Sequence, residues 1–141
     1  MFRNRELWGL DCKYSQITTN THLLEEDDED EEPRRYIPTG AIQRDYPVAI
    51  NNIRAHTSRL GYGENYTVEM GFSGAEGVCL TNHRRYFEKF TGPIYEPEVY
   101  IRQSITKEYP TGKLMHDFWE KLFSEVGSDL PDELIYEETE K

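Results

Sequence analysis

The most regular alternation of apolar and polar positions in the chain lies within residues 62–72. Large apolar side chains occupy every second position from residue 66 onward: Tyr66, Val68, Met70 and Phe72. Because successive side chains of a strand point to opposite faces of a sheet, this pattern predicts a half-buried β-strand. The turn residues at 73–77 then lead into Val78-Cys79-Leu80, which predicts an antiparallel hairpin.

Two other segments favour strands. Residues 98–106 alternate in the same way, and Pro97 stands at the entrance of this strand, where proline is tolerated. Residues 7–18 mix aromatic, β-branched and polar side chains with poor alternation, and they are compatible with an opening strand or hairpin.

Apolar positions recur at helical spacing in residues 46–60. Asp45 is a candidate N-cap, Pro47 lies early in the segment and Gly61 follows its end. All three features agree with the usual start and stop signals of helices. The sequence therefore predicts a helix over 46–60.

A more pronounced apolar face runs through residues 111–127, and it predicts the most strongly amphipathic helix of the chain. Six residues make up this face: Leu114, Met115, Phe118, Trp119, Leu122 and Val126. A shorter helix is expected from Asn82 to Phe90, closed by Thr91-Gly92-Pro93.

Strands interleaved with helices predict an α+β fold, in which a small, mainly antiparallel sheet carries helices packed on one side. At 141 residues the chain is expected to form one domain spanning 1–141. Two acidic appendages are expected on it. One is an exposed, mobile loop at 25–35, and the other is an exposed tail at 128–141.

Charge is distributed unevenly along the chain. The net charge of −11 divides into +1 for residues 1–24, −6 for 25–35, 0 for 36–110 and −6 for 111–141. Acidic surfaces attract basic partners and repel nucleic acid, so direct nucleic-acid binding is disfavoured. A basic protein surface is the expected partner, although both acidic segments could also serve solubility alone.

The sequence contains no apolar run that resembles a signal peptide or a membrane span, so we expect a cytoplasmic protein with no membrane association. Cys12 and Cys79 are far apart and lack CxxC spacing, which fits two buried thiols in a reducing compartment.

Catalytic motifs are weak. His116 and Glu120 share a helix face and could bind a metal, but two ligands do not complete a site. His56 lies beside hydroxyl residues, and His83 opens a stretch with basic and aromatic side chains, including Arg84 and Arg85. None of these patterns supplies a base oriented by a third group. The sequence favours a non-enzymatic protein and predicts no cofactor, no metal site and no catalytic residue.

Three function classes follow. The first is an inhibitor, of the immunity or anti-defence type, that blocks a basic nuclease or nucleic-acid-binding protein after electrostatic steering. The second is a structural or assembly subunit of an oligomer or virion, which leaves homo-oligomerisation open. The third is a small metal-dependent enzyme that uses its histidines. The first class places partner binding at Glu25, Glu26, Asp27, Asp28, Glu29, Asp30, Glu31, Glu32, Tyr36, Tyr136, Glu137 and Glu138.

Overall fold

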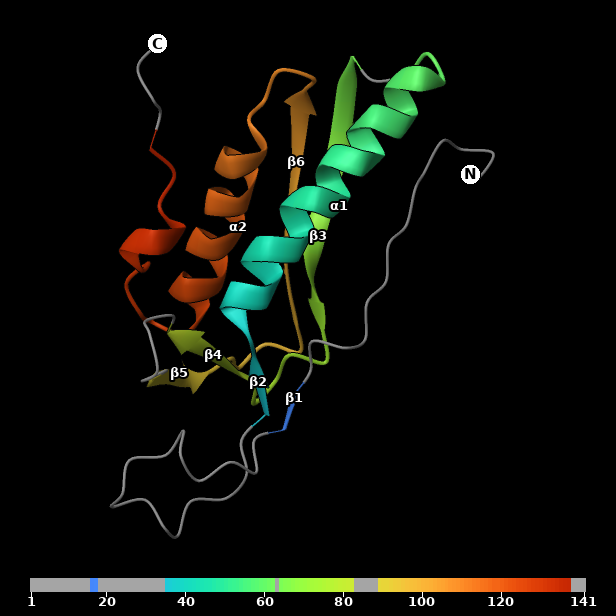
Figure 1. Ribbon diagram of the computed structural model, residues 1–141. Coiled ribbons are helices and arrows are strands. Elements are labelled where there is room, and N and C mark those ends of the chain that lie inside the picture. The colour runs from blue at the N-terminus through green and yellow to red at the C-terminus, as the bar shows by residue number, and fades with distance from the viewer. Residues whose placement is uncertain (1–15, 18–34, 63, 83–88, 138–141) are drawn as a thin grey trace, which may run out of the picture.

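The protein has an α+β fold in which two helices cover one face of a two-stranded antiparallel sheet (Figure 1). The computed structural model describes residues 16–17, 35–62, 64–82 and 89–137. The elements follow in the order β1 (Gln16–Ile17), β2 (Arg35–Ile37), α1 (Thr39–Arg59), β3 (Asn65–Ser73), β4 (Cys79–Asn82), β5 (Lys89–Pro93), β6 (Glu98–Thr106), α2 (Thr111–Glu125) and the 3-10 helix η2 (Asp132–Leu134). The predicted fold class is confirmed.

The two strands with the clearest alternation pair with each other. β3 and β6 run antiparallel through nine consecutive residue pairs, from Asn65 opposite Thr106 to Ser73 opposite Glu98. Their inner face is apolar and includes the buried Met70 and Val99. Both predicted strands are therefore confirmed, although residue 62 lies before the start of β3.

The predicted hairpin between β3 and residues 78–80 is wrong. Gly74 and Gly77 have φ values of 69° and 78°, and the chain turns there into another sheet, of order β1-β2-β4-β5. β4 pairs parallel to β2 and antiparallel to β5. Residues 78–80 are consecutive and all buried. Such a run is typical of a central strand covered on both faces, whereas a hairpin strand with one solvent-exposed face would alternate.

The helix predicted from Asn82 to Phe90 is wrong at both ends. Asn82 closes β4, and Lys89 opens β5, which pairs with β4. Residues 83–88 lie outside the described part of the chain. Thr91 belongs to β5, where its hydroxyl accepts the backbone N–H of Leu80 at 2.9 Å.

Helix α1 begins at Thr39, seven residues before the predicted start at 46, and it contains Pro47. No local side chain caps it. The N–H of Thr39 donates instead to the hydroxyl of Thr81 in β4 at 3.1 Å, and the Thr39 hydroxyl bonds the Thr81 carbonyl at 2.9 Å. Because this cap comes from a distant strand, a local sequence pattern does not reveal it.

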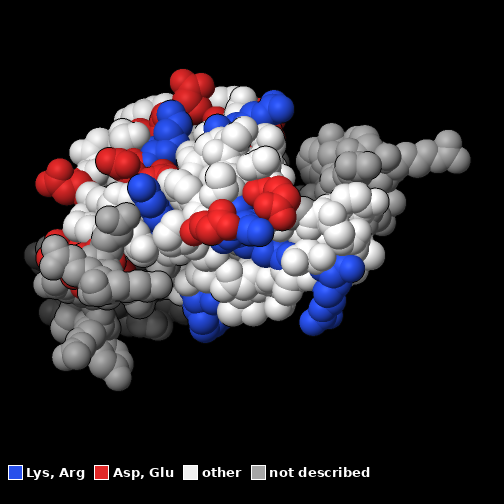
Figure 2. Space-filling view, turned by 90° about the horizontal axis from the view of Figure 1, so that it is seen from above, with Lys and Arg blue, Asp and Glu red and all other residues white. Residues whose placement is uncertain are grey.

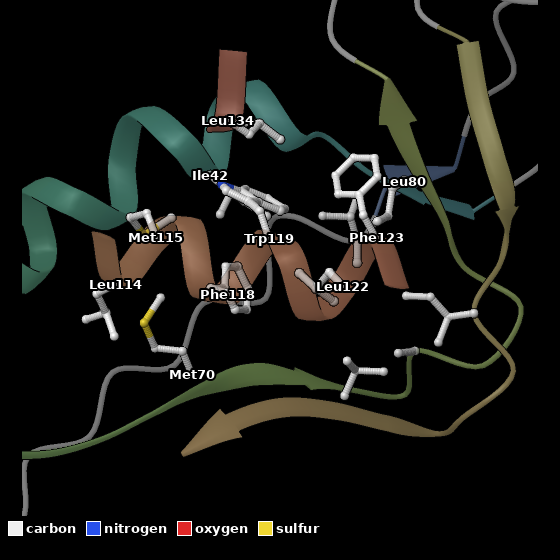
Figure 3. Packing of buried hydrophobic residues seen from close by; sticks show 14 of the residues in the cluster. Ile42, Met70, Leu80, Leu114, Met115, Phe118, Trp119, Leu122, Phe123 and Leu134 are labelled. Carbon is white, nitrogen blue, oxygen red and sulfur yellow. The ribbon is translucent and has the colours of Figure 1, made fainter. Parts of the chain in front are cut away.

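Helix α2 lies at the centre of the core, as its apolar face predicts (Figure 3). Phe118 stacks with Tyr46 of α1 and contacts Phe72 of β3, with ring centroids 6.2 and 5.8 Å apart. Trp119 is fully buried, and its indole N–H donates to Gln43 of α1 at 2.6 Å. No helix in the described part of the chain combines the length and apolar character needed to cross a bilayer.

Candidate acidic binding surface

The chain turns back immediately after α2. Gly127, at φ 67°, ends the helix, and the N–H of Ser128 donates to the carbonyl of Phe123 at 3.1 Å. Such a left-handed glycine closes a helix and reverses the chain without the strain that a side chain would cause. Leu130 then packs on the core, and Leu134 in η2 is buried. The segment 128–137 is therefore held against the body of the protein.

A second anchor lies beyond Leu134. The backbone N–H of Tyr136 donates to Nδ1 of His116 at 3.0 Å. The Tyr136 ring covers Gly112 so closely that a Cβ placed there would lie 2.9 Å from a ring carbon. The absence of a side chain at Gly112 therefore leaves the space that the Tyr136 ring occupies. Together with the hydrogen bond to His116, this contact fixes the backbone as far as Tyr136.

This anchored segment carries the carboxylates that we call the C-terminal acidic surface: Asp129, Asp132, Glu133 and Glu137, all exposed. Residues 111–137 contain seven carboxylates against two lysines. Both lysines have local partners. Lys121 pairs with Glu125 at 2.6 Å, and Lys113 lies over the Tyr109 ring. A net negative charge therefore remains on this part of the molecule.

The rest of the described body is electrically mixed. Arg54 bonds Thr111 and the carbonyl of Thr106, and Lys107 lies 3.3 Å from Glu64. Figure 2 shows acidic and basic side chains interspersed over the upper end of the molecule, without a field of one sign. Exposed pairs of this kind contribute little stability, about 0–1 kcal/mol each, but they cancel charge locally.

The residues expected to bind a partner fall into two groups. Glu25–Glu32 and Glu138 lie outside the described residues, as does most of the predicted loop at 25–35. Tyr36 is half-buried in β2, opposite Gln16 and Cys79. Tyr136 is half-buried on Gly112, and Glu137 beside it is exposed.

The histidines show no catalytic arrangement in the described part of the chain. His116 uses Nδ1 to hold Tyr136, so its place on the face of Glu120 serves a backbone contact. His56 is exposed, while its neighbour Thr57 donates to the carbonyl of Ile53. Among the described residues no group of three or more His, Cys, Asp or Glu side chains could hold a metal ion. His83, Arg84 and Arg85 lie outside this part.

Sequence reasoning missed one polar cluster. The Tyr109 hydroxyl donates to Asp117 at 2.6 Å, and Gln103 donates to the same carboxylate oxygen at 3.2 Å. Burial raises the pKa of the Tyr109 phenol above its usual 10.0, and the hydrogen bond to Asp117 raises that pKa further. A raised pKa disfavours the phenolate, so this shift does not activate the phenol as a base. The cluster ties the loop before α2 to β6 and to the helix.

Comparisons of the chain with protein-family models, curated proteins and solved structures found no match.

Proposed function

We propose that the protein is a non-enzymatic binding protein that uses its acidic segments to engage the basic surface of another protein. A nucleic-acid-binding groove, such as that of a nuclease, has the positive charge that this requires. Occupying that groove would make the protein an inhibitor. The observation that carries the proposal is the C-terminal acidic surface on a backbone anchored by Leu134 and Tyr136.

Anchoring matters because binding has to overcome the entropy of ordering the groups that make contact. A carboxylate on a fixed backbone loses only side-chain freedom when a partner binds, whereas one on a free tail also loses backbone freedom. Like charges fixed close together also raise the local potential, which accelerates encounter with a basic partner. The mixed charge of the rest of the body directs that encounter to the acidic end.

The acidic run Glu25–Glu32 is the second element of the proposal. Eight consecutive carboxylates supply more charge than the C-terminal acidic surface. In this scheme the run contributes mainly long-range steering, while Asp129, Glu133 and Glu137 make contacts in the complex. The two contributions are separable because steering acts on the association rate and short-range contacts act on the dissociation rate.

A pull-down from the native host, performed at low and at high salt, tests the proposal. The bait is the full chain in three forms: wild type, a triple variant with Asp129→Asn, Glu133→Gln and Glu137→Gln, and a variant with residues 25–32 replaced by Gly/Ser. The triple variant keeps Leu134 and Tyr136, so the anchors of the segment remain. A matched control, Glu69→Gln, Glu96→Gln and Glu108→Gln, removes the same charge from exposed sites elsewhere.

We expect a basic protein to be captured by wild type and by the matched control, to be lost at high salt, and to be reduced with the triple variant. Capture that is unaffected by salt, or that is as strong with the triple variant and with the Gly/Ser variant as with wild type, would contradict the proposal. Equal losses for the triple variant and the control would show that total charge acts, rather than this surface.

A further inference from the structure

The backbone geometry of β6 leaves a row of hydrogen-bonding groups facing away from β3. The N–H of Lys107 donates to the carbonyl of Glu64 at 3.1 Å, one step beyond the last strand pair. Hydrogen-bonded and non-hydrogen-bonded pairs alternate along an antiparallel ladder. Tyr100, Arg102 and Ser104 therefore stand in non-hydrogen-bonded pairs, and their N–H and C=O groups point to the outer edge.

No described strand covers this edge. The sheet has the order β3-β6, and no hydrogen bond between described residues reaches the outward backbone groups of Tyr100, Arg102 or Ser104. Natural edge strands are commonly blunted by proline, a bulge or an inward charge. β6 has none of these: its nine pairs are unbroken, and its inward residues are Val99, Ile101, Gln103 and Ile105.

The side chains of β6 match a second copy of the same strand in one antiparallel register. In this register the two-fold axis passes through Tyr100, so the two Tyr100 side chains lie opposite each other. On either side of them, Glu98 of one copy lies opposite Arg102 of the other, which gives two such pairs. All three side chains are on the exposed face, and Tyr100 is 51% exposed. On the inner face the same register places Val99 opposite Ile101. Opposite charges, aromatic pairs and aliphatic pairs are the cross-strand combinations that stabilise sheets.

We propose that two copies of the chain pair along their β6 edges in this register, joining two β3–β6 sheets into one four-stranded sheet. The interface is isologous, so it closes as a dimer and leaves the β3 edges outermost. Moving the axis to Arg102 would set Arg102 against itself, and an axis at Glu69 on the β3 edge would oppose two glutamates. The register at Tyr100 is the one in which both charged residues of β6 find opposite charges.

Charge reversal tests the register. Sedimentation equilibrium of the full wild-type chain should give a dimer, twice the chain mass of 16.6 kDa. Glu98→Arg opposes two arginines at both ends of the interface, and Arg102→Glu opposes two glutamates. Each should raise the dimer dissociation constant about tenfold or more. The double variant Glu98→Arg/Arg102→Glu restores both pairs with the signs exchanged and should recover the dimer.

Glu120→Arg is the matched control for Glu98→Arg, because it changes the charge by the same amount at an exposed site on α2. It should leave the dimer intact. Circular dichroism of each variant shows whether the fold is kept, which matters for Arg102→Glu because Arg102 also lies opposite Glu69 of β3. A monomeric wild type at submillimolar concentration overturns the proposal. So does a dimer that both single reversals leave unchanged.

Disulfide trapping provides a second, independent test of the same register. Tyr100→Cys, in a chain with Cys12→Ser, places two thiols across the axis at about 5.5 Å between Cα atoms, a separation that a disulfide spans. Oxidation should therefore give a covalent dimer. Ser104→Cys is the control on the same face and strand. In this register residue 104 lies opposite residue 96 of the other copy, eight residues from the second cysteine, so this variant should run as a monomer in non-reducing electrophoresis. Efficient trapping through residue 104 instead would overturn the register.

Discussion

At the scale of single residues, the polar cluster around Asp117 shows how this fold fixes a loop. Tyr109 and Gln103 both donate to one carboxylate oxygen, and the tyrosine is half-buried between β6 and α2. No motif announces the cluster, because its members come from a strand, a loop and a helix. A sequence pattern reveals residues that share a face at fixed spacing, but it does not contain contacts that only tertiary packing creates.

Tyr109→Phe should make stability less sensitive to alkali. The folded pKa of Tyr109 lies above 10.0, so the unfolded chain loses the phenolic proton first. The contribution of the Tyr109 phenol to the free energy of unfolding is therefore complete below pH 10 and is lost as pH rises through the folded pKa. At neutral pH the variant should lose about 1 kcal/mol with the missing hydrogen bond. Between neutral pH and pH above 10, its unfolding free energy should fall less than that of wild type.

Urea unfolding at a series of pH values measures this difference. Tyr95→Phe is the control, because the Tyr95 side chain is 75% exposed and its loss removes a phenol without a buried contact. The control should follow the wild-type profile. Parallel profiles for wild type and Tyr109→Phe would show that the ionisation of this half-buried phenol is not linked to folding.

At the scale of elements, periodicity identified β3, β6 and α2 but not the partners of the strands or the start of α1. The alternation of residues 66–72 specifies a strand with one buried face. β6 supplies the matching face, with Phe72 opposite Val99 and Tyr66 opposite Ile105. The choice of partner depends on where the glycine turns send the chain, which a local pattern does not contain.

The start of α1 illustrates the same limit from the side of energetics. Asp45 followed by Pro47 has the composition of a helix start, yet the helix passes through both. The turns before Pro47 are held by fully buried Ile42, by the bond from Trp119 to Gln43 and by the cap from Thr81. Together these contacts offset the roughly 3 kcal/mol that a proline costs inside a helix.

Pro47→Ala should therefore stabilise the protein. The alanine restores a backbone N–H to the helix interior and removes the proline ring, which is worth about 3 kcal/mol, while greater freedom of the unfolded chain returns about 1 kcal/mol of this. We expect a net gain of about 2 kcal/mol in the free energy of unfolding, measured in urea. Val48 is the exposed neighbour of Pro47, and the control Val48→Ala should change the free energy of unfolding by only about 0.5 kcal/mol. A loss of stability in Pro47→Ala would place the helix start at residue 46, where proline is favourable.

At the scale of the whole molecule, charge is the property that the sequence described best. The balance of residues 36–110 reappears as mixed and locally paired charges on the body, and the excess at the C-terminal end reappears on α2 and the segment after it. The sequence did not reveal that this segment is anchored. The anchoring contacts are made by single residues that belong to no periodic pattern: Leu134, Tyr136 and Gly112. These contacts form only because the chain reverses direction at Gly127.

The most direct test of an electrostatically guided binding protein is the association rate constant with the captured partner, measured by stopped flow across a range of ionic strength. We predict a rate that falls steeply with salt for wild type and for the matched control with Glu69, Glu96 and Glu108 neutralised. The slope should be shallower for the variant with Asp129, Glu133 and Glu137 neutralised, and shallowest when residues 25–32 are also replaced by Gly/Ser. A rate independent of salt, or the same slope in all four proteins, would contradict the account.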